Sequence, residues 1–277
     1  MDEIQGKHFL KGNDLREDYE FDGRFTDSGK NLYEVVRVID GVILFLENHM
    51  ERLYSSSKKS NLRPFVDQQE IKKLLIRLIK ANNLITGNIK IIFHYGNSEW
   101  EKNFYAYPIP FKYPSENDYR DGVKTEIFKF TRPDPEIKNW LGDFRENVDQ
   151  LKKKNSLYEV ILQNEDGLIT EGSQSNIFII KGKKIFTAPS NLILQGITRN
   201  KIISLCESGG LKLEQKEIDN NFLLSADAAF LTGTSPKILP VRFVGEKEFN
   251  MDKTIVPYLT LHYNNLIDKY IMECKNS

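Results

Sequence analysis

The most informative segment of the chain, residues 171–199, reads EGSQSNIFIIKGKKIFTAPSNLILQGITR. Its runs NIFII and KKIFTA are rich in isoleucine and phenylalanine, and they flank Lys181-Gly182-Lys183, which suits a tight turn. These features predict two β-strands joined by that turn. The loop that follows ends in Gly196-Ile197-Thr198, where we expect a helix to begin.

The predicted helix extends from about Thr198 to Gly209-Gly210, a typical C-terminal stop. A Gly-x-Thr sequence at its start offers backbone N–H groups, a hydroxyl and the positive end of the helix dipole, which together can bind an anion. A threonine before a helix is by itself most often only an N-cap. The anion site is therefore a hypothesis that needs support from the rest of the chain.

The second half of the chain alternates strand-like and helix-like stretches around this segment. Helix-like stretches near residues 139–156, 198–208 and 253–272 alternate with strand-like runs such as VKTEIFKF, YEVILQ and AAFLTGT. The polar, proline-containing segment KYPSENDYR at residues 112–120 is typical of a linker. We therefore expect a larger α/β domain over residues 116–277.

The first half has a different pattern. The runs LYEVVRVI and VILFLE flank Asp40-Gly41, a dipeptide suited to a two-residue hairpin turn. Apolar residues at helical spacing predict helices over 48–62 and 68–84, and NIKIIFHYG and NFYAYPIPF add strands. Residues 1–115 are thus predicted to form a small α+β domain, which makes the whole a two-domain α/β (α+β) fold.

Composition narrows the classes of function. The 277 residues are 40% hydrophobic, and 39 basic residues balance 39 acidic ones, so no general attraction to nucleic acid or anionic membranes is expected. No signal peptide or membrane span is evident. The two cysteines, Cys206 and Cys274, belong to no CxxC pair or metal motif and are interpreted as ordinary thiols. We expect a cytoplasmic protein with a small-molecule partner.

The 171–199 segment as a whole resembles the signature of the class IV aminotransferases, which include D-amino acid and branched-chain aminotransferases and aminodeoxychorismate lyases. The matching elements are Glu171-Gly172-Ser173, Asn176-Ile177-Phe178, Thr187, Leu194 and Gly196-Ile197-Thr198-Arg199. The resemblance implies the family's D-amino acid aminotransferase-like fold and its cofactor, pyridoxal 5′-phosphate (PLP).

It also implies that Glu171 faces the pyridine nitrogen of PLP and keeps it protonated, and that Ile197 and Thr198 bind the phosphate. Without the motif, Glu171 would be interpreted as a surface carboxylate.

The family's catalytic lysine lies slightly more than thirty residues before that glutamate. In FKFTRPDPEIKNWL this lysine is Lys138, 33 residues before Glu171. Lys152, Lys153 and Lys154 are nearer, but they lie in a charged helical stretch typical of a solvated face. A lysine that forms a Schiff base with PLP must be partly desolvated to be nucleophilic. Lys138 is therefore the predicted catalytic residue.

Two further elements match the family. FLENHMERLYSSS resembles its helix that carries a His and an Arg three residues apart, which implies that Arg52 binds the phosphate while His49 has a supporting role. FLTGTS resembles its strand-end loop, which implies that Thr234 binds the phosphate and Ser235 contacts the substrate. Taken alone, Arg52 would be a surface residue and TGTS a turn.

The substrate side diverges from the family. Tyr33 matches a tyrosine that contacts substrate in D-amino acid aminotransferases, but FHYGNS at residues 93–98 lacks their carboxylate-binding arginine. SGKN replaces the usual Gly-Asp-Gly before Tyr33, and NWLGD follows the lysine where known subgroups have other residues. Specificity for D-amino acids is therefore not predicted.

The leading hypothesis for function is transfer of an amino group between an amino acid and a 2-oxo acid by a homodimer, with PLP as cofactor and no metal. The alternatives are 4-amino-4-deoxychorismate lyase, which uses the same fold and lysine to eliminate pyruvate, and a PLP-fold protein without catalysis.

Overall fold

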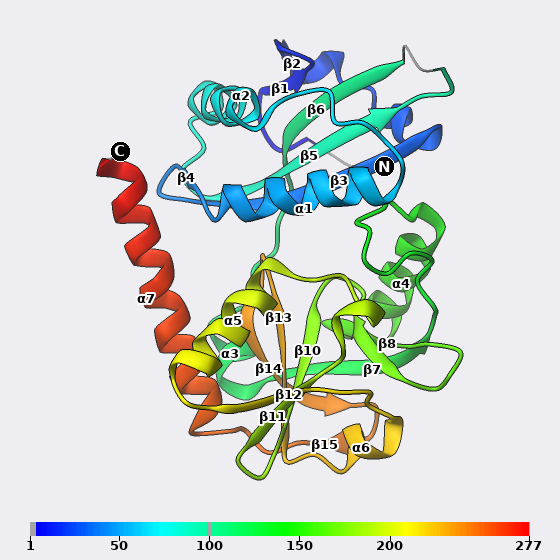
Figure 1. The fold of residues 1–277 in the computed structure, drawn as a ribbon, viewed down its shortest axis with the longest axis vertical. Coiled ribbons are helices and arrows are strands. Elements are labelled where there is room, and N and C mark those ends of the chain that lie inside the picture. Colours follow the sequence, from blue (N-terminus) through cyan, green and yellow to red (C-terminus); the bar gives the residue numbers. More distant parts are fainter. Residues whose placement is uncertain (1–3, 99–100, 277) are drawn as a thin grey trace. The chain divides into compact units, whose positions relative to one another are not determined.

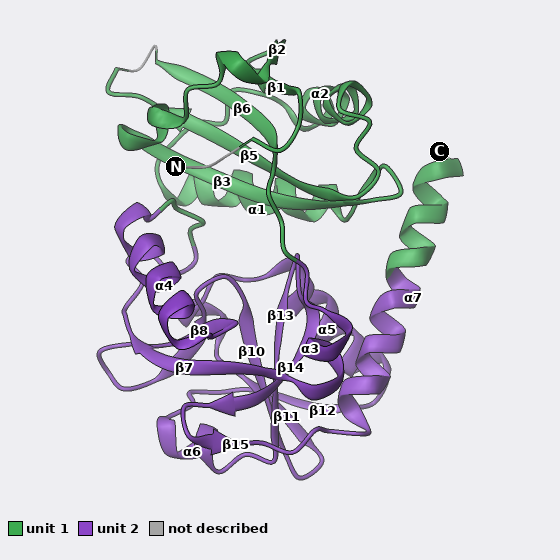
Figure 2. Cartoon of the chain, turned by 180° about the vertical axis from the view of Figure 1, so that it is seen from behind, with its two compact units in different colours: residues 1–112, 137–140, 267–277 green, residues 113–136, 141–266 purple. Residues whose placement is uncertain are grey.

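The structure of this chain is a computed structural model that describes residues 4–98 and 101–276. Its contacts divide the chain into two compact units (Figure 2). Unit 1 comprises residues 1–112, 137–140 and 267–277, and unit 2 comprises 113–136 and 141–266. This division starts close to the predicted linker, but it groups two later segments with unit 1. One of them carries Lys138.

Unit 1 is built on a six-stranded antiparallel sheet with the order β2-β1-β6-β5-β3-β4. The predicted hairpin joins β3 to β4, and Asp40 and Gly41 have φ angles of 52° and 74°, as a two-residue hairpin turn requires. The strands are β1 (His8–Lys11), β2 (Asp14–Glu17), β3 (Lys30–Ile39), β4 (Val42–Ile43), β5 (Gly87–Tyr95) and β6 (Lys102–Ile109).

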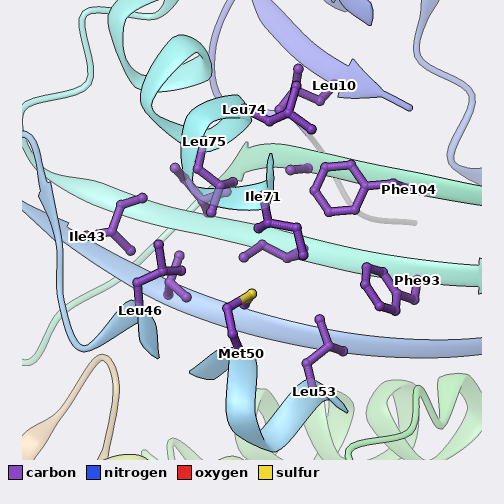
Figure 3. Packing of buried hydrophobic residues seen from close by; sticks show 14 of the residues in the cluster. Leu10, Ile43, Leu46, Met50, Leu53, Ile71, Leu74, Leu75, Phe93 and Phe104 are labelled. Carbon is purple, nitrogen blue, oxygen red and sulfur yellow. The ribbon is translucent and has the colours of Figure 1, made fainter. Parts of the chain in front are cut away.

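Helices α1 (Leu46–Lys59) and α2 (Gln68–Ala81) cover one face of this sheet, and α1 runs along β3 (Figure 1). The apolar stripes of the two helices meet the alternate residues of the strands that face them. Figure 3 shows Met50 and Leu53 of α1 and Ile71 of α2 packed with Phe93 and Phe104 of the sheet. Each buried side chain of this size stabilises the fold by roughly 1.5–3 kcal/mol.

The opposite face of the sheet carries a second, mainly aromatic cluster of buried side chains. Its members are Phe9, Tyr33, Ile92, Tyr105 and Tyr107, and Trp140 packs against it. The two clusters occupy opposite faces because successive strand residues point to opposite sides. Tyr33 therefore lies on the aromatic face, and its neighbour Glu34 lies on the helix-covered face.

Unit 2 is built on a nine-stranded mixed sheet with the order β12-β11-β10-β13-β14-β7-β8-β9, and β15 pairs with β14. The predicted turn at Lys181–Lys183 joins β10 to β11. The strands are β7 (Val123–Lys129), β8 (Glu159–Gln163), β9 (Ile169–Gly172), β10 (Asn176–Lys181), β11 (Lys184–Thr187), β12 (Lys212–Gln215), β13 (Ala228–Gly233), β14 (Lys237–Val244) and β15 (Lys247–Glu248).

The helices of unit 2 are α3 (Glu116–Asp121), α4 (Gly142–Asn155), α5 (Ile197–Ser208) and α6 (Asn220–Leu224). Helix α4 packs Phe144 and Val148 on Val160 and Leu162 of β8. Helix α7 (Ile255–Asn276) begins in unit 2, and its residues from 267 onward are grouped with unit 1, where Tyr270 donates a hydrogen bond of 2.6 Å to Glu47.

Several elements differ from the sequence-based prediction, among them α3 and β14. The supposed linker holds α3, which begins with a capping box between Ser115 and Asp118, so part of this polar stretch is helical. Strand β14 was not predicted, because Pro240 interrupts its apolar run although it pairs with Phe230 in the sheet. Among the described residues, no helix combines the length and the apolar character needed to cross a membrane.

Candidate active site

Lys138 lies in a short extended segment of unit 1 that hydrogen-bonds to the beginning of β3. Its carbonyl accepts from the N–H of Tyr33 at 3.3 Å, and its own N–H donates to Oγ of Ser56 at 3.4 Å. The side chain is half-buried, and Nζ lies 4.6 Å from the centre of the Tyr33 ring. Lys138 is thus partly removed from water, whereas Lys153 and Lys154 on α4 are exposed.

Arg52 is held by a buried carboxylate that the sequence analysis did not identify. Its Nε donates to Oε1 of Glu34 at 2.7 Å, and its terminal Nη2 donates to Oε2 at 2.6 Å. His49 approaches the same Oε2 through Nδ1 at 2.8 Å. Glu34 is fully buried and lies on β3, and His49 and Arg52 contact it from one face of α1. The carboxylate therefore fixes the orientation of both side chains.

The charge states of this cluster follow from burial and contact. Burial alone would raise the pKa of Glu34, but the charge of Arg52 and the hydrogen bonds from Arg52 and His49 outweigh it and lower the pKa to about 2. Burial lowers the pKa of His49 despite the opposing effect of Glu34. Near neutral pH the carboxylate is charged and the imidazole is neutral, so Nδ1 of His49 carries the proton and donates it.

In unit 2, Glu171 lies at the end of β9 and is almost fully buried. Its Oε2 accepts from the N–H of Leu194 at 3.1 Å and from the amide of Asn176 at 3.3 Å, and its Oε1 accepts from Arg132 at 3.3 Å. Three donors, one of them a guanidinium, favour the ionised form of this carboxylate. Such a group can hold a proton on a ring nitrogen.

Asn176 connects Glu171 to two other elements of the site. Its amide also donates to the carbonyl of Leu194 at 2.9 Å, and its backbone pairs with Thr232 of β13. A Cβ atom added to Gly196 would lie 2.1 Å from Oδ1 of Asn176, so any other residue there would displace this amide. Asn176 thereby brings the end of β9, the start of α5 and the end of β13 together within unit 2.

The start of α5 has the features of an anion site. Gly196 is its N-cap and provides no side chain, and the first helical N–H groups of Ile197 and Thr198 have no partner within the helix, as at any helix start. The hydroxyl of Thr198 lies 3.2 Å from that of Tyr263, and either can donate. Both threonine and tyrosine are buried, so the hydroxyl pair has a defined position.

The loop between β13 and β14 contains Thr234 and Ser235, both half-buried. Just before it, Oγ1 of Thr232 is buried and has no hydrogen-bond partner among the described residues. An unsatisfied buried hydroxyl is costly, and a bound polar group would relieve that cost. Thr232 lies on β13 and pairs with Asn176, the residue of β10 whose amide donates to Glu171.

These groups fit the cofactor that the resemblance implies. A phosphate suits the N–H groups and hydroxyl at the start of α5, a protonated ring nitrogen suits the buried carboxylate of Glu171, and the amine of Lys138 suits a carbonyl. Within unit 1 the structure brings together Tyr33, Lys138 and the hydrogen-bonded group of Glu34, His49 and Arg52. Within unit 2 it brings together Glu171, Ile197 and Thr198, with the strand that leads to Thr234 and Ser235.

Sequence reasoning missed four residues that orient these groups. Glu34 lies inside a strand-like run, Thr232 was part of the quoted FLTGTS element without an assigned role, and Arg132 was visible only as part of the Lys138 segment. Asn176 was part of the quoted motif but had no assigned role. Cys206 is buried in α5, and burial raises the pKa of its thiol to about 12, which disfavours the reactive thiolate.

Comparison with known proteins connects this geometry to a family. Residues 31–244 match the model for amino-transferase class IV. The D-alanine aminotransferase of Bacillus licheniformis is 32% identical over 225 residues, which cover 77% of this chain and 78% of the relative.

Two solved structures, each about one-fifth identical in sequence, share the fold. The branched-chain amino acid aminotransferase of Escherichia coli superposes with a TM-score of 0.85 at 20% identity and covers 95% of both chains. The PLP form of the branched-chain amino acid aminotransferase from Thermobaculum terrenum superposes with a TM-score of 0.81 at 22% identity. The match covers 96% of this chain and 94% of that one.

Proposed function

This chain belongs to the class IV aminotransferase family, and from that premise we propose that it uses PLP to move an amino group between an amino acid and a 2-oxo acid. The observation that carries the proposal is the convergence on Asn176 of a buried carboxylate, a helix start and an unsatisfied hydroxyl. This arrangement matches the chemistry of the PLP ring and phosphate.

When bound, PLP supplies an electrophilic carbonyl and a ring that accepts electrons. The amine of Lys138 would hold the cofactor through its carbonyl. The same amine would take the proton from Cα of the amino acid. The carboxylate of Glu171 keeps a proton on the ring nitrogen, and the donors around Glu171 keep it charged and in place.

The remaining residues bind and orient. The N–H groups of Ile197 and Thr198, the hydroxyls of Thr198 and Thr234 and the guanidinium of Arg52 bind the phosphate. Glu34 keeps Arg52 in the required orientation through two hydrogen bonds. Tyr33 and Ser235 contact the substrate, and Tyr33 already lies against Nζ of Lys138. The active form is a cytoplasmic homodimer, and sedimentation at micromolar concentration tests the dimer.

The decisive experiment is chemical. The purified protein with PLP should be yellow, and borohydride reduction should fix the pyridoxyl group covalently to the peptide that contains Lys138. Attachment to Lys152, Lys153 or Lys154 instead would contradict the assignment. Incubation with a panel of D- and L-amino acids plus 2-oxoglutarate or pyruvate should then yield new amino acids.

The same protein is incubated with 4-amino-4-deoxychorismate, and pyruvate is measured. Pyruvate release without amino transfer to any 2-oxo acid would identify a lyase. Absence of both reactions in a protein that binds PLP would identify a fold without this catalysis.

A further inference from the structure

The aromatic face of the unit 1 sheet carries several basic residues. Four rows of paired residues cross β3, β5 and β6 on this face, and they contain Arg37, Lys90 and His94. Within these described strands, no Asp or Glu lies on this face. The rows are Asn31, His94 and Asn103; Tyr33, Ile92 and Tyr105; Val35, Lys90 and Tyr107; and Arg37, Asn88 and Ile109.

Lys90 is the basic residue of this face that contacts the same aromatic ring as Lys138. Only 2% of its surface is exposed, although lysine is among the residues least often fully buried. Its Nζ lies 3.6 Å from the centre of the Trp140 ring and 5.3 Å from that of Tyr33. These rings meet edge to face, with centres 5.7 Å apart. The ammonium group therefore lies against the aromatic rings of Trp140 and Tyr33.

Tyr33 is shared by the two lysines. Nζ of Lys138 lies 4.6 Å from the centre of that ring, so the two nitrogens are separated by no more than the sum of their distances to it. Trp140 follows Lys138 by two residues on the segment that pairs with β3. The contacts that position the reactive amine thus also position the second cation.

The chemistry of the substrate explains this arrangement. An amino acid brings its amino group to the place that Nζ of Lys138 occupies, and its carboxylate is attached to the adjacent carbon. A cation on the same aromatic wall can reach that carboxylate and pair with it in surroundings of low polarity, where the attraction is strong. Lys90 also lies on β5, upstream of residues 93–98, where the expected arginine is missing.

We propose that the ammonium group of Lys90 binds the α-carboxylate of the amino acid and the 2-oxo acid, and so determines that this site accepts carboxylates. This inference rests on the proposed function, which states that the substrates are amino acids and 2-oxo acids. Lys90 takes no part in proton transfer. Its charge fixes the substrate with Cα near Lys138, and Trp140 fixes Lys90.

The test compares Lys90→Met, which removes the charge at similar volume, with Lys90→Arg, which keeps it. Lys102→Met, at an exposed lysine on β6, is the matched control. Binding to the PLP-loaded protein is followed through cofactor absorbance with two non-reacting ligands, propanoate and its uncharged analogue propanamide. Melting curves and the cofactor spectrum of each variant verify folding and loading.

In Lys90→Met, the Kd for propanoate should rise at least tenfold while propanamide binding changes less than threefold. KM for the most active amino acid should rise at least tenfold, with a smaller change in kcat. Lys90→Arg should retain most of the propanoate affinity, and Lys102→Met all of it. Equal losses for both ligands, or unchanged propanoate binding, would overturn the proposal. If the wild type transfers no amino group, the proposed function fails, and propanoate binding still decides the role of Lys90.

Discussion

At the scale of single residues, the charge of Glu171 has the clearest predicted effect. Glu171→Gln preserves the shape but removes the charge that holds a proton on the ring nitrogen, and its amide nitrogen would face donors such as Arg132 and Leu194. Negative charge reaches the ring only after Cα loses its proton. The substitution should therefore remove more stabilisation from the transition state than from the ground state. We expect kcat to fall at least a hundredfold, on the order of 3 kcal/mol.

PLP should remain bound in this variant, as its absorbance will show. Glu165→Gln, at an exposed carboxylate, should behave as the wild type. Recovery of apoprotein that turns over normally in excess PLP would mean that Glu171 only helps to hold the cofactor.

Arg52 should contribute to cofactor affinity through its charge and its orientation. Removing a partly buried charged hydrogen bond costs roughly 1.5–3 kcal/mol, so Arg52→Ala should weaken the Kd for PLP by about one to two decades. Arg52→Lys retains the charge but not the paired hydrogen bonds to Glu34. Its Kd for PLP should therefore lie between those of the wild type and Arg52→Ala. Titration of apoprotein with PLP measures both variants. Unchanged affinity in Arg52→Ala would remove Arg52 from the phosphate site.

The sequence predicted Arg52 but not the residue that orients it. Glu34 lies in the run LYEVVRV, where one acid among apolar residues resembles the polar position of a half-exposed strand. Alternation with Leu32 and Val36, which face the core, places it inside. The available signal was that a charged residue alternates with core residues on the same face of the strand. This signal could be used only if it was known which face α1 covers.

At the scale of elements, the close approach of β10 to the start of α5 makes Gly196 critical. Gly196→Ala would place Cβ 2.1 Å from Oδ1 of Asn176, so this amide would have to move away from Glu171 and Leu194. The φ of Gly196 is −67°, so the effect would be steric and not due to backbone strain. We expect PLP affinity to fall at least tenfold, measured by titration, with Ser204→Ala on the exposed side of α5 unchanged.

Elements with strong apolar periodicity were predictable, and short or interrupted ones were not. Helix α2 presents Ile71, Leu74, Leu75 and Leu78 at helical spacing, and all four are buried. Helix α3 has six residues and no buried side chain, so its capping box was the only local signal. Strand β14 is stabilised by neighbours on both sides, and this tertiary pairing outweighs the missing N–H of Pro240.

At the scale of the whole molecule, the sequence predicted Lys138 as the catalytic residue but not the unit to which it belongs. Its spacing to Glu171 came from the family resemblance, and the boundary after residue 115 placed it in the second domain. The backbone of residues 137–140 instead pairs with the start of β3, about a hundred residues earlier in the chain. Pairing over such a separation leaves no local pattern in the sequence.

The buried acid network also predicts how the stability of the protein depends on pH. The pKa of Glu34 is lowered from 4.5 to about 2, so the unfolded chain takes up a proton at higher pH than the folded chain. The contribution of Glu34 to the free energy of unfolding should therefore be constant above about pH 5 and fall as the pH approaches 2, by about 3 kcal/mol at most. The lowered pKa of His49 acts in the same direction and begins to reduce stability below pH 6.5.

Urea denaturation at several pH values between 7 and 3, followed by tryptophan fluorescence, measures this loss, and Trp140 reports on unit 1. Glu34→Gln should be less stable than the wild type at pH 7, because it leaves the Arg52 charge without its carboxylate. Its stability should vary less with pH, so the two curves should converge in acid. Glu165→Gln should follow the wild type throughout. Parallel curves for Glu34→Gln and the wild type would show that Glu34 titrates alike in the folded and unfolded chain, and that the Arg52 contact does not hold its charge.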